Sequence, residues 1–367
     1  MSTVRAAVMT LPDAPIEVRD IPRPAPEPGG ALMRVILSEV CGTDVHLRDG
    51  RLAGVPYPII PGHVSVGEII ETGGPIEDVQ GRPIRVGDTV TFLDVHETCH
   101  ACWYCLVARA STRCPHRKVY GITYGVADGL TGGWAEALCL KPGVKIIPLR
   151  APTAERFMAG GCGLPTSLHA IERAGILPGD SVLVLGAGPV GLSLVILARM
   201  VGAASVLCIG GPDSRLHAAQ RAGADDTLEF TQRDRDGRAS WVRDRTGGRG
   251  ADIVFEATGA PSAVTDAMEF AREAGRLVVV GQYTDHGETL FNPHTQLNQK
   301  HLDVRGCWGS DYSHFHRAAL LMEDERRAAA WTDAISTERF GLSQMNEALR
   351  AVEEGRVVKA LVDPALD

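Results

Sequence analysis

Four cysteines in one short loop form the densest cluster of metal-binding side chains in the sequence: Cys99, Cys102, Cys105 and Cys114. Two, two and eight residues separate them in turn. Thiolates spaced in this way can surround one ion tetrahedrally, and a closed shell of four cysteines leaves no position open for a substrate. The loop therefore predicts a structural zinc, with a four-iron cluster as the chemical alternative because it takes the same ligands.

A glycine-rich motif follows the apolar run Ser181–Leu185 and reads Gly186-Ala187-Gly188-Pro189-Val190-Gly191. In a dinucleotide-binding turn the first glycine permits a tight turn, the second lets the backbone approach a pyrophosphate, and the third allows a helix to pack closely on a strand. The helix N-terminus then offers N–H groups to the phosphates. Because a strand precedes the motif and an apolar helical stretch follows it, we expect a site for NAD or NADP rather than a simple glycine-rich turn.

The choice between NAD and NADP depends on the end of the second strand, where an acidic side chain normally binds the ribose hydroxyls. Gly210 stands in that place, so both the acceptor and its repulsion of a 2′-phosphate are missing. Asp213 would disfavour the phosphate if it lies close, whereas Arg215 would either pair with it or cover the adenine. The balance is nearly even and weakly favours NAD.

The elements that position these motifs change character along the chain. The first third reads as short strands punctuated by glycine and proline, which predicts a mostly antiparallel β domain with long loops. From about residue 165 apolar strands alternate with helical stretches, which predicts a parallel sheet covered on both faces. The predicted strands are Val4–Met9, Ala31–Ser38, Gly67–Thr72, Thr89–Leu93, Ala135–Leu140, Ser181–Leu185, Ser205–Ile209, Ile253–Phe255, Leu277–Val280 and Ala360–Val362, and the predicted tail helices are Phe315–Trp331 and Gln344–Glu354.

Composition excludes several classes of partner. The chain has 367 residues, a net charge of −8 and 44% hydrophobic residues, which gives no electrostatic reason to expect nucleic acid or an anionic membrane. We find neither a membrane-spanning apolar run nor a signal peptide at the N-terminus, so we expect a cytoplasmic protein. An odd count of nine cysteines is no disulfide framework, which favours metal binding.

Taken together, the motifs resemble one family. The segment CGTDVH from Cys41 to His46, the tripeptide PGH ending at His63, the four-cysteine loop, Cys162 and the glycine motif occur in the order and spacing of the zinc-dependent alcohol dehydrogenases of the medium-chain dehydrogenase/reductase superfamily. The resemblance covers essentially the whole chain. It implies an α/β protein with a GroES-like β-rich catalytic domain at residues 1–163 and 307–367 and a doubly wound Rossmann domain at residues 164–306.

The resemblance also implies a catalytic zinc bound by Cys41, His63 and Cys162, with the fourth position open. Two thiolates and an imidazole hold zinc firmly, and an open position keeps it a Lewis acid. Taken singly, each residue has a plainer interpretation, since cysteines are often small buried hydrophobes and a histidine can be satisfied in a core.

Three neighbours of the zinc ligands take roles from the same resemblance. Thr43 is expected to hydrogen-bond the alcohol oxygen and His46 to pass the proton to solvent through the cofactor ribose. Asp44 is expected to accept the other ring N–H of His63 and so fix its tautomer. The alternatives are a capped turn for Thr43 and Asp44 and an exposed helix histidine for His46.

The family's cofactor contacts carry over to scattered positions. Thr166 should lie near the nicotinamide, backbone groups around Val280, Gly306 and Trp308 should meet the carboxamide, and Lys359 should lie against the pyrophosphate, although a solvated surface lysine is the competing reading. The complete expected cofactor set is Thr166, Gly186, Gly188, Pro189, Val190, Gly191, Gly210, Arg215, Thr258, Val280, Gly306, Trp308 and Lys359.

Two departures from the family's pattern stand out. Its ligand histidine is usually followed by glutamate, behind the zinc, whereas Val64 follows His63 here. Glu68 is near in sequence, but nothing in the sequence shows that it substitutes. The last gap in the four-cysteine loop is also one residue longer than usual.

The function implied is the reversible oxidation of a primary, secondary or cyclic alcohol to an aldehyde or ketone, with hydride transfer to NAD or NADP. The alternatives are a zinc-free enoyl or quinone reductase and a non-catalytic nucleotide-binding protein of the same fold. We expect Val95, Tyr120 and Tyr124 to approach the substrate pocket, with Arg48 and Tyr57 at its rim. By analogy with the family, a homodimer or homotetramer is expected.

Overall fold

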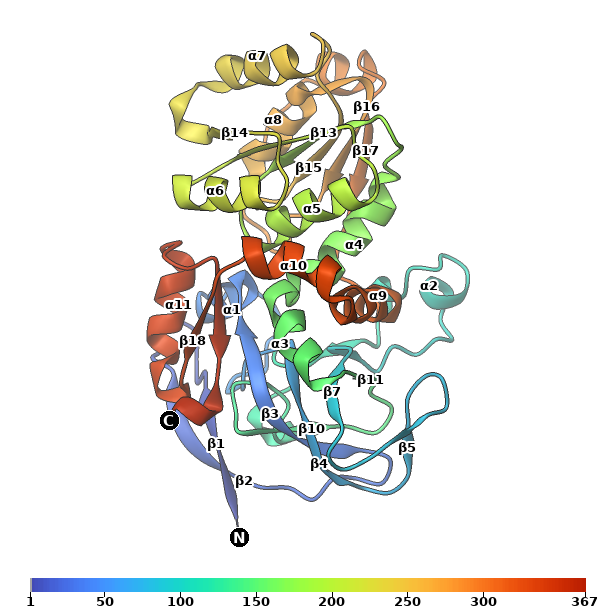
Figure 1. Ribbon diagram of the computed structural model, residues 1–367. Helices are drawn as coiled ribbons and strands as arrows, with labels where there is room; N and C mark the ends of the chain where they lie inside the picture. The colour runs from blue at the N-terminus through green and yellow to red at the C-terminus, as the bar shows by residue number, and fades with distance from the viewer. Residues whose placement is uncertain (1) are drawn as a thin grey trace. The chain divides into compact units, whose positions relative to one another are not determined.

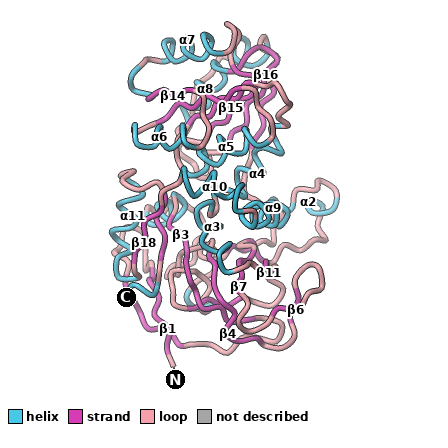
Figure 2. The backbone as a smooth tube through the Cα atoms, viewed as in Figure 1, coloured by secondary structure: helices cyan, strands magenta, loops and turns pink. Residues whose placement is uncertain are grey.

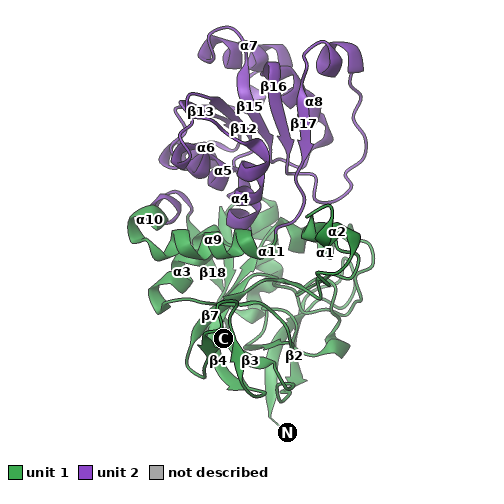
Figure 3. Ribbon diagram, turned by 90° about the vertical axis from the view of Figure 1, so that its right-hand side faces the viewer, with its two compact units in different colours: residues 1–161, 311–328, 336–367 green, residues 162–310, 329–335 purple. Residues whose placement is uncertain are grey.

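The computed structural model describes residues 2–367, and Figure 1 shows their helices and strands in chain order. The chain divides into two compact units, coloured separately in Figure 3. Unit 1 comprises residues 1–161, 311–328 and 336–367, and unit 2 comprises residues 162–310 and 329–335. Each unit is built around its own sheet.

Unit 1 contains a seven-stranded sheet in the order β11-β7-β4-β3-β19-β18, with β10 also paired to β3. All pairs in this sheet are antiparallel except β18 with β19. The elements of unit 1 are β1 (Thr3–Val8), β2 (Glu17–Pro22), β3 (Ala31–Val40), α1 (Gly42–Arg48), β4 (Ser65–Thr72), β5 (Ile76–Glu77), β6 (Pro83–Ile84), β7 (Thr89–Phe92), β8 (Val95–His96), α2 (Trp103–Leu106), β9 (Lys118–Val119), β10 (Ala137–Leu140), β11 (Ile146–Pro148), α3 (Ala151–Gly160), α9 (Tyr312–Glu323), β18 (Thr337–Phe340), α11 (Met345–Glu353) and β19 (Lys359–Val362).

The central strand β3 is nearly continuously buried, which explains why so much of the unit is organised around it. Met33 and Val35 belong to a core cluster that also contains Ile69 of β4 and Val90 of β7. At its C-terminal end β3 delivers Cys41 to the start of α1. The long buried strand thus fixes the position of the first predicted zinc ligand.

Unit 2 contains a six-stranded sheet in the order β14-β13-β12-β15-β16-β17, and every pair in it is parallel. Its strands are apolar because helices cover the sheet, and the core includes Leu183, Leu207, Val254 and Leu277. Figure 2 shows the helices packed around these strands. The elements are α4 (Gly163–Ala174), β12 (Ser181–Leu185), α5 (Pro189–Met200), β13 (Ser205–Gly210), α6 (Asp213–Arg221), β14 (Asp226–Glu229), α7 (Arg235–Arg245), β15 (Ala251–Glu256), α8 (Pro261–Phe270), β16 (Ala271–Val279) and β17 (Asp303–Gly306).

The predicted tail helix Phe315–Trp331 is wrong as a single element. The structure has two helices instead, α9 and α10 (Glu325–Ala334), separated at Asp324. Asp324 adopts an extended backbone and its carboxylate accepts a hydrogen bond from the N–H of Arg326, at 3.0 Å, which is the behaviour of an N-capping residue. The end of α10 belongs to unit 2, where the Trp331 indole donates to the Ser193 hydroxyl at 3.1 Å.

None of the helices within residues 2–367 is long and apolar enough to span a membrane. The fold class predicted from the sequence, a β-rich domain joined to a doubly wound parallel sheet, is confirmed.

Candidate metal sites and dinucleotide pocket

The four-cysteine loop brings its thiols together in two close pairs. The Sγ atoms of Cys102 and Cys105 are 3.5 Å apart, and those of Cys99 and Cys114 are 3.6 Å apart. All four ligand atoms lie within 4.8 Å of one another. Tetrahedral zinc–thiolate geometry requires sulfur–sulfur separations of about 3.8 Å, so the loop fits a zinc ion.

The local backbone explains why these thiols converge. Cys102 is the N-cap of the short helix α2, and Cys105 lies one helical turn further on. A hydrogen bond from the N–H of Ala101 lowers the pKa of Cys99 to about 6, whereas burial and the neighbouring thiols raise the pKa of Cys105 to about 12. Four thiols this close cannot all ionise without a cation to balance them, which a divalent metal would supply.

A second group of metal-binding side chains combines residues from distant parts of the sequence. Potential ligand atoms of Cys41, His63, Cys162 and Glu39 lie within 4.8 Å of one another. The Nε2 atom of His63 is 4.0 Å from the Sγ atom of Cys41, close to the separation of about 3.6 Å expected for a sulfur and a nitrogen on one tetrahedral zinc. The three predicted ligands are therefore close enough to bind one ion, and Glu39, which no sequence motif indicated, is beside them.

The start of α1 holds Cys41 in place. Cys41 is the N-cap of α1, its Sγ atom accepts a hydrogen bond from the N–H of Thr43 at 3.3 Å, and its own N–H donates to Asp44 Oδ2 at 2.9 Å. N–H donors and a helix N-terminus favour the thiolate form of cysteine. The cap therefore prepares Cys41 as a metal ligand.

His63 and Asp44 are both buried, and each has one polar atom without a hydrogen-bond partner among residues 2–367: Nδ1 of His63 and Oδ1 of Asp44. No hydrogen bond joins the two side chains, so the predicted second contact of His63 stays a prediction. Burial raises the pKa of Asp44 well above its usual value. Burial alone would lower the pKa of His63, but the adjacent Cys41 thiolate outweighs it and raises that pKa to about 10. A buried imidazole next to a thiol is a donor set that fits a metal cation.

Thr43 and His46 lie on α1, one turn apart, and both are half-buried. Side chains with this spacing share one face of a helix. The same short helix thus supplies the N-cap of one metal ligand and the two groups predicted to handle the substrate proton.

The glycine motif of unit 2 lines a pocket of about 450 Å³. Gly186 has a φ of +108°, and a Cβ added to it would lie 2.8 Å from the Ala257 carbonyl oxygen. Gly188 is the N-cap of α5 and has open space where a Cβ would be, while a Cβ at Gly191 would overlap the Gly186 carbonyl. These three environments suit a tight turn, a close backbone approach and close helix packing.

Only some residues of the predicted cofactor set line this pocket. Its lining includes Gly186, Gly188, Gly210, Arg215 and Thr258. The remaining residues of unit 2 in the set are not part of this lining: Thr166 on α4, Pro189, Val190 and Gly191 on α5, Val280 after β16, Gly306 at the end of β17, and Trp308, which stacks on Tyr283.

Lys359 is not the solvated surface lysine that the sequence left open. It lies on β19 of unit 1, is 2% exposed, and its Nζ atom is 3.2 Å from Glu39 Oε2. Its predicted contact with a pyrophosphate stays a prediction.

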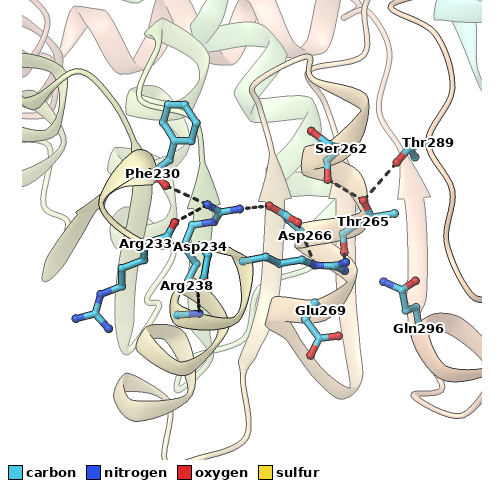
Figure 4. Close-up of polar contacts among 12 residues, drawn as sticks. Phe230, Arg233, Asp234, Arg238, Ser262, Thr265, Asp266, Glu269, Thr289 and Gln296 are labelled. Carbon is cyan, nitrogen blue, oxygen red and sulfur yellow. Dashed lines mark hydrogen bonds and ion pairs between the residues drawn. The ribbon is translucent and has the colours of Figure 1, made fainter.

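Two polar clusters around the pocket were not found by sequence reasoning. The buried carboxylate of Glu256 accepts hydrogen bonds from the N–H and hydroxyl of Thr258 and from the N–H of Gly259, at 2.7, 2.7 and 2.9 Å. In Figure 4 the Arg238 guanidinium contacts the carbonyl of Phe230 and the carboxylate of Asp266. Both clusters fix loops that line the pocket, but neither follows a recognisable motif.

Tyr120 and Tyr124, which we expected to approach the substrate pocket, are both buried, and that approach stays a prediction. Both rings belong to the hydrophobic core of unit 1. The Tyr120 hydroxyl accepts a hydrogen bond from the N–H of Lys141, and the Tyr124 hydroxyl contacts His96 and Glu97. At the predicted rim, the Tyr57 hydroxyl donates to a backbone carbonyl, and Arg48 pairs with Asp49 and Glu353, whereas Val95 is simply buried on β8.

Comparison with known proteins gives the same family for both units. The model described as "Alcohol dehydrogenase GroES-like domain" matches residues 27–151, and that described as "Zinc-binding dehydrogenase" matches residues 189–324. The chain is 32% identical over 369 residues to 5-exo-hydroxycamphor dehydrogenase of Pseudomonas putida, with all of both chains covered. It is 30% identical to D-arabinitol dehydrogenase 1 of Uromyces fabae, covering 91% of this chain and 89% of the relative. The crystal structure of an alcohol dehydrogenase from Thermotoga maritima is similar, with a TM-score of 0.91, 30% identity and coverage of 99% of this chain and 100% of that one.

The chain therefore belongs to the zinc-dependent alcohol dehydrogenases of the medium-chain dehydrogenase/reductase superfamily. It is an NAD(P)-dependent oxidoreductase acting on alcohols, and the zinc-free and non-catalytic alternatives are not favoured.

Proposed function

We propose that the protein oxidises secondary alcohols to ketones, reversibly, at a metal held by Cys41, His63 and Cys162. The observation that carries this proposal is the convergence of two thiols and one buried imidazole within 4.8 Å. Two thiolates and one imidazole form a known catalytic zinc set, which leaves a position for the substrate.

The residues of α1 give this site its proton chemistry. When bound, zinc would act as a Lewis acid on the alcohol oxygen and the nicotinamide would accept the hydride. Thr43 orients the alcohol by accepting a hydrogen bond from its hydroxyl. As the alcohol proton moves to the Thr43 oxygen, the Thr43 hydroxyl gives up its own proton in the direction of His46, one turn along α1, which releases a proton to solvent. Asp44 fixes the N-terminus of α1 through the N–H of Cys41 and so holds this pair in place.

We further propose two zinc ions per chain, with the four-cysteine loop as the structural site. The catalytic domain is assigned to residues 1–163 and 307–367 and the cofactor domain to residues 164–306. Free thiols support the two proposed zinc sites, because none of the nine cysteines forms a disulfide. They also favour the reducing cytoplasm as the location of the protein.

For the cofactor, we propose that NADP is accepted at least as well as NAD. The lining of the pocket includes Gly210, Gly211 and Arg215 but not Asp213, the residue that the sequence suggested would repel a 2′-phosphate. Asp266 also lines the pocket, but its charge is balanced by Arg238 at 2.8 Å. Arg215 is thus the cation assigned to the phosphate. A Sinorhizobium meliloti structure described as a zinc-binding dehydrogenase bound to NADP supports this, with a TM-score of 0.83, 25% identity and coverage of 99% and 100% of the two chains.

The preference for a secondary alcohol is supported by the names of the relatives. They include dehydrogenases of 5-exo-hydroxycamphor and of the 3-hydroxyl of L-threonine, both secondary alcohols. The dehydrogenases named for arabinitol, erythritol or threitol, and sorbitol act on polyols, which also carry secondary hydroxyls.

For assembly, we propose a homodimer formed through β17. This strand is at the edge of the six-stranded sheet, and its Val304 side chain is 39% exposed. An edge strand presents unpaired backbone N–H and C=O groups, so a second copy of β17 would extend the sheet. Light scattering should give a dimer, and Val304→Lys should shift it towards monomer.

The experiment that tests the proposed activity is a hydride-transfer assay with matched primary and secondary alcohols of the same chain length. Nicotinamide absorbance is followed with NAD and with NADP, before and after removal of metal by a chelator and after zinc is restored. We expect faster turnover of the secondary alcohols, loss of activity on chelation and recovery with zinc. Full activity in protein shown to contain no zinc would overturn the proposal.

A further inference from the structure

Glu39 and Lys359 form an ion pair in the interior of unit 1. Glu39 Oε2 and Lys359 Nζ are 3.2 Å apart, and each side chain is 1% exposed. Lys359 Nζ also donates to the carbonyl of Gly160 at 3.3 Å. Removing two charges from water is costly, and their mutual attraction often does no more than offset the cost. Stability alone is therefore a weak explanation for a pair this deeply buried.

The pair lies against the metal-binding group. A carboxylate oxygen of Glu39 is within 4.8 Å of the ligand atoms of Cys41, His63 and Cys162. The Glu39 N–H donates to the carbonyl of Val64, the residue directly after His63, at 3.1 Å. The backbone pairing of β3 thus places this carboxylate beside the position where the sequence lacks one.

Gly161 keeps the space around the pair open. It has a φ of +50°, and a Cβ added there would overlap both the Glu39 carboxylate and the Lys359 ammonium. Position 161, immediately before Cys162, therefore requires glycine. The Glu39–Lys359 pair thus constrains the backbone that leads to this predicted metal ligand.

We propose that Glu39 is a displaceable fourth ligand of the metal bound by Cys41, His63 and Cys162. Carboxylate oxygen is an ordinary zinc ligand, and three protein ligands leave one place for it. Lys359 acts as a positioning residue, because its ammonium attracts the carboxylate that the metal also attracts. The carboxylate occupies the metal when substrate is absent and moves to Lys359 when the alcohol arrives. This inference rests on the proposed catalytic metal.

The test uses the full-length protein with cobalt(II) in place of zinc, titrated with imidazole while the visible d–d absorption is followed. Only an open or displaceable site responds to imidazole, so the closed four-cysteine site stays silent. Imidazole must displace Glu39 in the wild type. Glu39→Gln should therefore bind imidazole more tightly, by roughly tenfold, which corresponds to about 1.4 kcal/mol. Lys359→Met should bind it more weakly, because Glu39 then has no competing partner.

Glu68→Gln is the matched control. Glu68 is on β4 and pairs with Arg34 at 2.6 Å, with more than a third of each side chain exposed, so its removal should leave imidazole binding unchanged. If Glu39→Gln is too unstable to load, the double variant Glu39→Gln/Lys359→Met, which removes both charges, should show the same tightening.

Opposite changes in imidazole affinity for Glu39→Gln and Lys359→Met support the proposal. If the pair were merely structural, both variants would change the imidazole affinity in the same direction. Unchanged imidazole affinity in folded, loaded Glu39→Gln or in the double variant overturns it. Failure of the proposed function is distinguishable, because the wild type would then take up only one cobalt per chain and show no spectral response to imidazole at all.

Discussion

The Nε2 atom of His63 and the Sγ atom of Cys41 lie 4.0 Å apart although 22 residues separate them in sequence. Strand β3 carries the chain to Cys41, and His63 comes two residues before the neighbouring strand β4. The antiparallel pairing of β3 with β4 therefore brings the two ligands together. A metal site of this kind is a property of the sheet register, because a slip of one residue would turn the side chains to the opposite face.

Loss of one thiol from the four-cysteine loop should remove one zinc per chain. Cys105→Ser breaks the contact of 3.5 Å with Cys102 and leaves three ligands for the ion. Because the free energy of structural zinc binding is also folding free energy, the melting temperature should fall by several degrees and the loop should become sensitive to protease. Metal analysis and thermal melts measure this.

Cys139→Ser is the control for that variant. Cys139 is on β10, belongs to neither metal-binding group, and has its pKa raised to about 11 by burial. Its zinc content should equal that of the wild type. Equal zinc content in Cys105→Ser would show that the loop does not bind zinc.

Removal of the Thr43 hydroxyl should reduce catalysis without removing metal. Thr43→Val keeps the backbone N–H that donates to Cys41 Sγ, so the ligand stays in place. Loss of a group that transfers a proton costs roughly 10²- to 10⁴-fold in rate, and kcat should fall accordingly. Thr43→Ser retains the hydroxyl and should keep most of the activity. A Thr43→Val enzyme with normal zinc content and wild-type kcat contradicts the assigned role.

Arg215 should determine how well a 2′-phosphate is bound. Arg215→Ala removes the cation assigned to the phosphate and should raise the Kd for NADP by roughly tenfold, which corresponds to about 1.4 kcal/mol, while the Kd for NAD changes little. Arg233→Ala is the control, since its side chain in Figure 4 points away from the other labelled residues. Equal losses for both cofactors would mean that Arg215 covers the adenine.

Gly210→Asp is a poorer probe, because a Cβ there would be 2.9 Å from the backbone nitrogen of Ala187.

The carboxylate of Asp252 should give the cofactor domain part of its acid sensitivity. It accepts hydrogen bonds from the N–H and hydroxyl of Ser181, at 2.7 and 2.6 Å, and pairs with Arg272 at 2.5 Å. Burial alone would raise the pKa of Asp252, but these partners outweigh it and hold that pKa below its usual value.

A lowered folded-state pKa means that the stabilisation is present above the unfolded pKa of about 3.9 and is lost as the pH falls through the folded pKa. Asp252→Asn should therefore lower the free energy of unfolding by roughly 1–2 kcal/mol at pH 7. The expected loss is small because the Asp252 carboxylate is partly exposed to solvent. In urea unfolding, the difference should shrink as the pH falls below about 4. Asp244→Asn, which changes an exposed residue of α7, should show no such trend. A difference that stays constant down to low pH contradicts the assignment.

Local patterns predicted much of the fold and part of the site. The strand Ser181–Leu185 has the predicted bounds, because apolar runs next to a glycine turn are unambiguous. The four cysteines could be grouped from one loop alone. Residue type alone was ambiguous where it fits two environments, as for Lys359, which could have been a solvated surface lysine and is 2% exposed.

Local patterns could not predict contacts between distant segments, and the grouping of Cys41, His63 and Cys162 came from the family resemblance alone. Glu39 meets Lys359 because β19, close to the C-terminus, pairs with β3 so that Leu361 is opposite Glu39. No periodic pattern in the sequence predicts that register. The break between α9 and α10 was also missed, since it depends on a single capping aspartate, Asp324, inside an otherwise helical pattern.

The central claim is that Cys41, His63 and Cys162 hold a second zinc at which the reaction takes place. The most direct measurement is the zinc content per chain of the wild type and of Cys162→Ser, made alongside hydride transfer on the same samples. We predict two zinc ions in the wild type, and one in Cys162→Ser with its activity lost and its fold retained. Two zinc ions and undiminished hydride transfer in Cys162→Ser would contradict the account.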